Sequence, residues 1–445
     1  MKFLYALSLS TLLALFAGVA EAKTIAHGQF HTCWVMVSST PGATNLSPGE
    51  GYIRCTGLGE DGQLGSSEYS YPAWTGTPPA GWYCGNWQDC QVRDTVSGTW
   101  LVNTTDIAAG ARHTCAIANG GALYCWGSNA YGQLGDGTTV NKYRPTLIVA
   151  SGATQVVAGN THTCAMISGL AKCWGRNNYG QLGTNAIGVN QSTPTNVANN
   201  GPTVLNIRGL ASGDEHVCAL GGGGSTPYGF NLYCWGLNTS SQINASTGNK
   251  SSPTARPFLP TGYIGAFEAM AGNTISCGRH VGSGRVFCWG GNVSVGINSS
   301  SVYDMGVVPS VEAMSLPHFP DGKQLCKLAT NASGGPELQC KGLRTNCRLG
   351  DGAWAANYYD GVCAVTTATT FQVIPLPAAP SNMTAFSEIA SGSGSTCVRS
   401  TYGGLAYAYN CWGDDSWGQI GAGGFNGPGV PHYVPNLEGF YPISQ

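Results

Sequence analysis

The chain has 445 residues, of which 9% are charged, and its formal net charge is -2. Average globular proteins carry roughly 25% charged residues, so the chain lacks both the charge runs of a disordered polyelectrolyte and a basic surface for nucleic acid. Its 66 glycines, with many aromatic and β-branched residues, favour short strands and tight turns.

The first 22 residues have the features of a secretory signal peptide. Lys2 supplies the positive n-region, residues 3–19 form an apolar h-region, and residues 20–22 read Ala-Glu-Ala, a small-x-small cleavage pattern. An uncleaved anchor helix is the alternative, which the short apolar run disfavours. We therefore expect a mature chain that begins at Lys23, is not inserted in a membrane after cleavage, and is secreted. Its compartment is extracellular, or periplasmic if the source is Gram-negative.

From Lys23 onward, one sequence unit recurs seven times. The clearest copies read HTCAIANGGALYCWGSNAYGQLGDG from His113 and HTCAMISGLAKCWGRNNYGQLG from His162. Each unit offers a small-residue strand ending in Gly, a strand with a first Cys, a strand with a second Cys, and a strand near a Pro. Repeats of roughly 40–50 residues with four strands are typical of β-propellers. The sequence predicts an all-β, seven-bladed β-propeller with four-stranded antiparallel blades over residues 23–445.

The recurring G-x-x-H-T-C and WG-x-N-x-x-G-Q-L-G patterns resemble the regulator-of-chromosome-condensation repeat, whose members form seven-bladed propellers. The resemblance covers nearly the whole mature chain. The chain departs from the family by a cysteine pair in every unit, and by Thr56 and Lys341 at the Trp position of units one and six. Family members include a nuclear nucleotide-exchange factor and a secreted inhibitor of β-lactamases, so the resemblance implies a binding scaffold.

The 18 cysteines behind a signal peptide indicate disulfides. Facing cysteines on antiparallel neighbours lie near disulfide distance, so the repeat register predicts one bond in each blade and one in each of two insertions. Zinc is the alternative for a spacing such as that of Cys84 and Cys90, but no His or Cys pair completes a finger. No metal and no cofactor is expected. The expected pairs are Cys33–Cys55, Cys115–Cys125, Cys164–Cys173, Cys218–Cys234, Cys277–Cys288, Cys326–Cys340, Cys397–Cys411, Cys84–Cys90 and Cys347–Cys363.

Histidine recurs at one position of four units. A metal ring or a set of catalytic bases could use such residues, but Ile275 and Ser395 occupy the same position elsewhere. We therefore interpret the histidines as making a repeated structural hydrogen bond within each blade. The four residues are His31, His113, His162 and His216.

Groups suited to catalysis are scarce. Asp214–Glu215 and Asp414–Asp415 are adjacent pairs, and adjacent side chains on a strand point to opposite faces. No nucleophile elbow, phosphate loop or zinc-protease helix motif is found. We expect no enzymatic activity. The competing class of protein is a glycan-active propeller enzyme. Two carboxylates in one cleft, or a Tyr/His/Arg group there, would favour that interpretation.

Two insertions, at about residues 66–99 and 348–359, begin at the same point of the repeat and form the best candidate binding site. Aromatic side chains in a disulfide-held loop lose little entropy on contact, which suits recognition of a protein or glycan. A self-packed loop cap is the alternative. Units one and six flank unit seven in a ring, so both loops should leave the same rim. The candidate residues are Trp74, Trp82, Tyr83, Trp87, Trp354, Tyr358 and Tyr359.

These patterns predict a secreted, disulfide-stabilised scaffold that binds another extracellular protein, with carbohydrate as the second choice of ligand. Asn-x-Ser/Thr sequons recur and can carry glycans in a source that glycosylates secreted proteins. Residues 24–28 match the first strand of a unit and residues 431–439 match the last. We expect these two end strands to lie side by side and close the ring.

Overall fold

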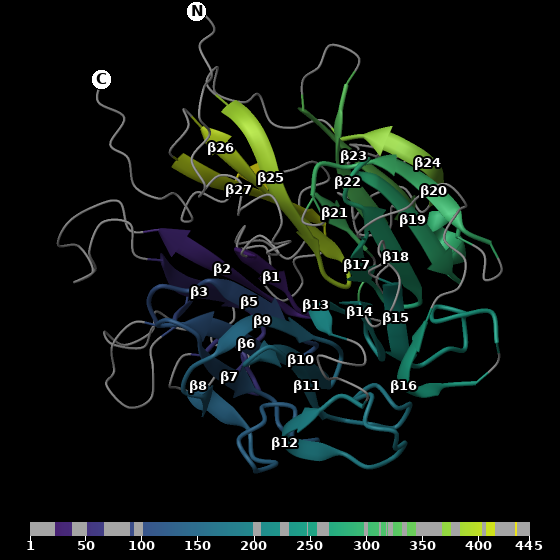
Figure 1. The fold of residues 1–445 in the computed structure, drawn as a ribbon. Coiled ribbons are helices and arrows are strands. Elements are labelled where there is room, and N and C mark those ends of the chain that lie inside the picture. Colours follow the sequence, from purple (N-terminus) through teal and green to yellow (C-terminus); the bar gives the residue numbers. More distant parts are fainter. Residues whose placement is uncertain are drawn as a thin grey trace, which may run out of the picture.

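The computed structural model shows seven four-stranded antiparallel sheets, arranged as the blades of a propeller (Figure 1). This confirms the predicted fold. Among the described residues, no helix is long and apolar enough to cross a membrane. The structure describes residues 23–37, 51–65, 90–92, 101–198, 206–222, 231–246, 248–255, 267–297, 301–310, 313–316, 318, 324–331, 336–343, 367–374, 383–402, 406–413 and 432–433.

Each blade takes its four strands from one repeat unit, in chain order. Blades one to three contain β1 (Ile25–His27), β2 (His31–Val37), β3 (Gly51–Gly57), β4 (Cys90–Gln91), β5 (Asp106–Ala109), β6 (His113–Ala118), β7 (Ala122–Gly127), β8 (Lys142–Val149), β9 (Ala153–Ala158), β10 (His162–Ile167), β11 (Leu170–Gly175) and β12 (Gln191–Asn196).

Blades four to seven follow the same order. They contain β13 (Ile207–Ser212), β14 (His216–Gly221), β15 (Asn231–Gly236), β16 (Lys250–Ala255), β17 (Phe267–Ala271), β18 (Ile275–His280), β19 (Arg285–Gly290), η1 (Val293–Val295), β20 (Tyr303–Val307), β21 (Met314–Ser315), β22 (Gln324–Thr330), β23 (Pro336–Leu343), β24 (Thr367–Val373), β25 (Met383–Ser391), β26 (Ser395–Tyr402), β27 (Ala406–Gly413) and β28 (His432–Tyr433).

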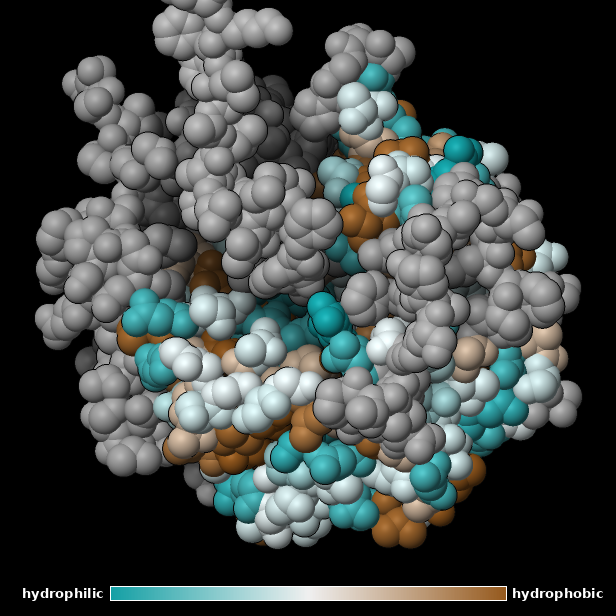
Figure 2. All heavy atoms as spheres, in the orientation of Figure 1, coloured by the Kyte–Doolittle hydropathy of each residue, from teal (hydrophilic) through white to brown (hydrophobic). Residues whose placement is uncertain are grey.

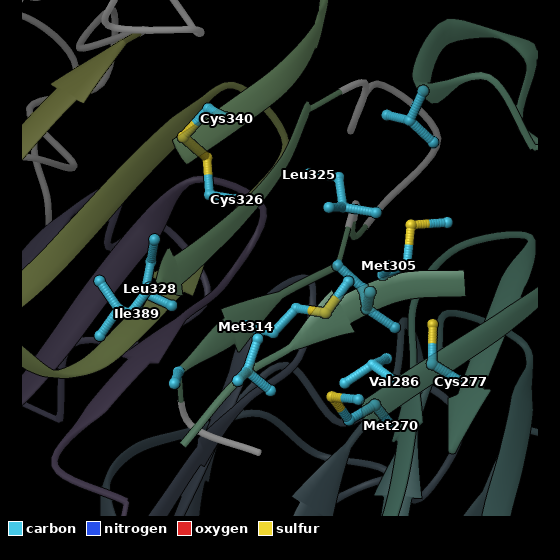
Figure 3. Packing of buried hydrophobic residues seen from close by; sticks show 14 of the residues in the cluster. Met270, Cys277, Val286, Met305, Met314, Leu325, Cys326, Leu328, Cys340 and Ile389 are labelled. Carbon is cyan, nitrogen blue, oxygen red and sulfur yellow. A yellow bond between two sulfur atoms is a disulfide. The ribbon is translucent and has the colours of Figure 1, made fainter. Parts of the chain in front are cut away.

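Burial follows the order of the strands within a blade. The first strands line the axis of the ring, and all six residues of β6 and of β10 are buried. The fourth strands lie at the outer edge, where no residue of β12 or β16 is buried. The core therefore lies between the faces of neighbouring blades. Figure 3 shows one such cluster, where Met270, Met314 and Ile389 come from the first strands of blades five, six and seven.

One disulfide within each blade joins the second strand to the third, as the repeat register predicts. The paired Cα atoms are 4.0–4.1 Å apart and all of these cysteines are buried. Cys84, Cys347 and Cys363 lie outside the described residues, so Cys84–Cys90 and Cys347–Cys363 stay predictions. The bonds are Cys33–Cys55, Cys115–Cys125, Cys164–Cys173, Cys218–Cys234, Cys277–Cys288, Cys326–Cys340 and Cys397–Cys411.

The ring closes through the inner strands of blades seven and one. The carboxylate of Glu388 in β25 accepts hydrogen bonds from the backbone nitrogens of Thr24 and Ile25, each at 3.0 Å, and β1 packs against β25. β28 instead pairs with β27 as the outermost strand of blade seven. The expected side-by-side closure by the two end strands is therefore wrong, because each unit supplies all four strands of its own blade.

Candidate functional site

One edge of the propeller, which we call the loop rim, carries two connections from every blade. The start of the second strand lies opposite the end of the third, as in the pairs His113–Gly127 and His162–Gly175. The turn that precedes the second strand and the loop that follows the third strand therefore emerge at the same edge. The repeated motif of each unit builds this rim.

The Gly-Gln-Leu-Gly loop of one blade docks on the next blade. The backbone oxygen of Gln133 accepts hydrogen bonds from Nε1 of Trp174 at 2.9 Å and from Oγ1 of Thr163 at 2.8 Å. Gly135 has φ of +83°, and a Cβ there would lie 2.6 Å from Nε1 of Trp174, so glycine is required. The same indole bond joins Trp126 to Gln63 (2.9 Å), Trp235 to Gln181 (3.0 Å) and Trp289 to Gln242 (2.9 Å). The motif holds neighbouring blades together.

The recurring histidines also join neighbouring blades, so the expected bond within each blade is wrong. Nε2 of His113 lies 2.9 Å from Oγ1 of Thr163 in the next blade. Val217 replaces that threonine in blade four, and His162 bonds Ser212 instead, at 3.0 Å. The remaining contacts are His31–Thr114 and His216–Ser276, both at 2.8 Å.

These histidines are buried and neutral. Burial lowers the pKa of His113 to about 4 and the pKa values of His31, His162 and His216 to about 3. Among the described residues, no group of three His, Cys, Asp or Glu side chains is placed to hold a metal ion. The histidines are suited to fixing the angle between blades rather than to acid–base work.

Blade one compensates for its missing tryptophan. Thr56 occupies the position in β3, but Trp34 in β2 is fully buried and packs against Tyr409 of blade seven, with ring centroids 6.3 Å apart. The hydroxyl of Tyr409 donates a hydrogen bond to the backbone oxygen of Val35 at 3.1 Å. The tryptophan that fills this seam thus comes from the second strand of the blade instead of the third. In the sequence, its position directly after Cys33 indicates this.

The seven inner strands enclose a cavity of about 210 Å³ on the axis of the ring. Small and aliphatic side chains line most of it, and two carboxylates, Glu268 and Glu388, reach its wall. Both have structural partners: Oε2 of Glu268 is 2.7 Å from Nη1 of Arg279, and Glu388 holds the first residues of β1. Burial raises the pKa of Glu388. The two carboxylates are therefore committed to the fold, which weakens the case for a glycosidase-like pair in this cavity.

Polar side chains gather where the axis meets the loop rim, in the turns between first and second strands. Oδ1 of Asp214 lies 3.6 Å from Nδ1 of His318. Oε1 of Glu215 accepts a hydrogen bond from Nδ2 of Asn160 at 3.1 Å and Oε2 accepts one from Nε2 of Gln181 at 2.7 Å. Burial raises the pKa of Glu215 to about 7. Asp214 and Glu215 have different partners, as expected for adjacent residues. Asp414 and Asp415 lie outside the described residues.

Exposed apolar side chains stand on the same rim. Tyr131 packs under the guanidinium of Arg176, which is 4.8 Å from the ring centroid. Val140 and Val189 are exposed in the loops that follow the third strands of blades two and three. The sequence-based interpretation missed these residues, although β-branched residues inside polar loops were a usable signal. Figure 2 shows hydrophobic residues in separate small patches among hydrophilic ones on the face it presents.

The seven candidate aromatic residues in the two insertions lie outside the described residues. Their anchors are described. Gly65 precedes the first insertion and follows the third strand of blade one. Leu343 is the last described residue before the second insertion, and its Cα partner is Thr367 at the start of β24. Both anchors belong to loop-rim connections. β25 of blade seven packs against β1 and β21, so blade seven stands between the two anchor blades.

Fold and seams together define a disulfide-stapled propeller in which the Gln-containing loops of blades one to four each bind the following blade. The family model for the Regulator of chromosome condensation (RCC1) repeat matches residues 120–166 and 169–220. A second model of that repeat matches residues 105–133. Residues 105–220 therefore carry RCC1 repeats, and the seven-bladed propeller fits that family.

Curated relatives match parts of the chain. The human E3 ubiquitin-protein ligase HERC2 is 35% identical over 86 residues, 18% of this chain and 2% of the relative. The probable E3 ubiquitin-protein ligase HERC4 of Rattus norvegicus is 27% identical over 191 residues, 41% of this chain and 16% of the relative. The crystal structure of Prp20p from Saccharomyces cerevisiae has a TM-score of 0.59 at 16% identity, covering 85% of this chain and 84% of that chain. This last likeness shows the fold alone.

Proposed function

We propose that the protein is a secreted scaffold that binds another protein on the loop rim. The observation that carries this proposal is the convergence on one edge of exposed apolar side chains, charged side chains and both insertion anchors. Large aromatic and arginine residues dominate binding energy at protein interfaces, and Tyr131 with Arg176 is such a pair. The rim rests on rigid blades, which suits recognition without a large ordering cost.

Secretion is supported by the cysteines. Disulfides persist in oxidising compartments, and every blade contains one between its second and third strands. The second ground is the sequence of residues 1–22, which has the features of a secretory signal peptide. We include secretion in the proposal on these two grounds.

Protein binding also agrees with a structural relative. The work on Prp20p concerns its binding to Gsp1p and histones, and a propeller rim offers a broad surface for such contacts. We place the partner of this chain on the loop rim, with Trp74, Trp82, Trp87 and Trp354 of the insertions as its anchors. A glycan ligand or a glycan-active enzyme is the competing outcome.

The experiment is capture of partners from the native extracellular fluid on immobilised mature protein, followed by mass spectrometry. Trp87→Ala, Trp354→Ala and Tyr131→Ala should each weaken capture at least about tenfold, the effect of one hot-spot residue, with thermal unfolding nearly unchanged. The matched control is Val281→Ala, an exposed residue in the turn between β18 and β19, at the opposite edge. Equal capture by all four variants would exclude the loop rim, and enrichment of glycans alone would exclude a protein partner.

A further inference from the structure

Within the described residues, the seam between blades five and six lacks the histidine–hydroxyl and indole hydrogen bonds that join blades one to five. Ile275 stands at the histidine position and Leu325 at the threonine position, and both are fully buried in one apolar cluster. Lys341 stands at the tryptophan position of β23. η1 of blade five packs against β22, β23 and β24 of blade six. Figure 3 shows Leu325 and Met305 facing this seam.

Two lysines of blade six share one aromatic ring in this apolar seam. Nζ of Lys327 lies 4.4 Å and Nζ of Lys341 lies 5.0 Å from the ring centroid of Phe371. Lys327 is 9% exposed and Lys341 is 7% exposed, whereas lysine side chains normally keep their ammonium groups in water. Phe371 belongs to the outer strand β24 and is partly exposed, so the pair lies near the outer surface.

The two ammonium groups have few partners. Lys327 donates a hydrogen bond to the backbone oxygen of Met305 at 2.8 Å. For Lys341, the contacts found within the described part of the chain are the ring of Phe371 and repulsion by Lys327. Burial lowers the pKa of both lysines, and the charge of Lys327 further lowers the pKa of Lys341.

The two described acidic residues that act on Lys327 have other partners. Asp304 and Glu337 attract Lys327 electrostatically. Oδ2 of Asp304 lies 2.7 Å from Nε of Arg285, and Glu337 accepts a hydrogen bond from Gln339. Two like charges in an apolar seam are costly unless an opposite charge joins them.

We propose that Lys327 and Lys341 form a binding site for a small oxyanion, such as sulfate or phosphate. Lysine is a compact point charge with three donors, and it binds phosphate-like groups in that capacity. An oxyanion beside the two ammonium groups accepts their hydrogen bonds and removes their repulsion, while Phe371 covers one side. The anion then takes the place of the tryptophan contact that closes other seams. This site is separate from the loop-rim partner and does not depend on it.

Calorimetric titration of the mature, disulfide-bonded chain with sodium sulfate and with sodium phosphate tests the site, at fixed ionic strength set with sodium chloride. The wild-type chain should show saturable binding of at least one anion. Lys341→Met should weaken that binding at least tenfold. The matched control Lys172→Met, a partly exposed lysine of β11, should bind as the wild type does.

Thermal unfolding gives a second readout. A bound anion raises the unfolding temperature with saturation, whereas sulfate excluded from any protein surface raises it continuously. Absence of saturable heat in the wild type, or equal binding by wild type and Lys341→Met, overturns the proposal. If Lys341→Met does not fold, Lys327→Met replaces it and should weaken anion binding at least tenfold. The titration of the wild-type chain tests for saturable binding without either variant.

Discussion

Nε2 of His27 in blade one lies 3.0 Å from Oγ of Ser395 in blade seven, and this contact helps to close the ring. The histidine and the hydroxyl have exchanged blades relative to the other seams. At the other histidine seams, the histidine belongs to the earlier blade and the hydroxyl to the later one. Here blade seven supplies the serine at the histidine position, and the first strand of blade one supplies the histidine. Gly392 allows the exchange, because a Cβ there would lie 2.7 Å from Nδ1 of His27.

The exchanged contact predicts a rescue. His27→Ala removes the hydrogen bond and leaves a buried hydroxyl, so it should destabilise the chain by about 1–3 kcal/mol. Ser395→His alone should clash with the His27 ring. The double variant should be more stable than either single one, because Thr32 stands at the acceptor position used in other blades. Urea unfolding with intact disulfides measures all three. A double variant no better than the worse single variant would contradict this account of the closure.

The hydrogen bond from the indole of Trp174 should contribute measurably to the free energy of unfolding. Trp174→Phe keeps an aromatic ring but loses the donor to Gln133. Trp34→Phe is the control, because Nε1 of Trp34 has no partner within the described residues although the side chain is equally buried. Trp174→Phe should cost about 1 kcal/mol more than Trp34→Phe. Equal losses in chemical denaturation would assign the role of Trp174 to packing alone.

Buried histidines should make the fold sensitive to acid. Burial lowers the pKa of His27 and of His113 to about 4, below the ordinary value of 6.5, so the unfolded chain takes up protons first. Stability should therefore fall as pH drops below 6.5, by about 3 kcal/mol for each such histidine by pH 4. His113→Gln should show a shallower loss between pH 6.5 and 4. Denaturation midpoints that stay constant over this interval would refute the prediction.

Glu215 should act in the opposite direction. Burial raises its pKa to about 7 from the ordinary 4.5, so the protonated form stabilises the fold below pH 4.5 and that contribution is lost as pH rises through 7. Glu215→Gln should gain stability relative to the wild type between pH 5 and pH 8, by about 1–3 kcal/mol. Glu60→Gln, at an exposed residue of the same rim, is the control for the effect of the substitution itself. A pH-independent difference for Glu215→Gln would show that the carboxyl is ionised throughout.

The sequence by itself determined the number of blades, the strand order and the pairing of cysteines within blades. These features depend on contacts inside one hairpin, such as Cys115 with Cys125, whose partners are fixed by a short spacing that the chain repeats. In an antiparallel hairpin, that short spacing places the two cysteines opposite each other on adjacent strands. For the same reason, the motif was enough to place the insertion anchors on one rim.

Only the tertiary structure decided which side chains meet between blades. The size of the repeated Trp was enough to place it in a seam between blades, but the repeat pattern does not give its hydrogen-bond partner in the other unit, nor that His113 bonds the next blade. Trp34 replaces a missing tryptophan from another strand, and the Lys327–Lys341 pair meets at Phe371 only after β22, β23 and β24 assemble. Such contacts depend on the angle between neighbouring twisted sheets around the axis of the ring. That angle is fixed only when all seven blades pack together.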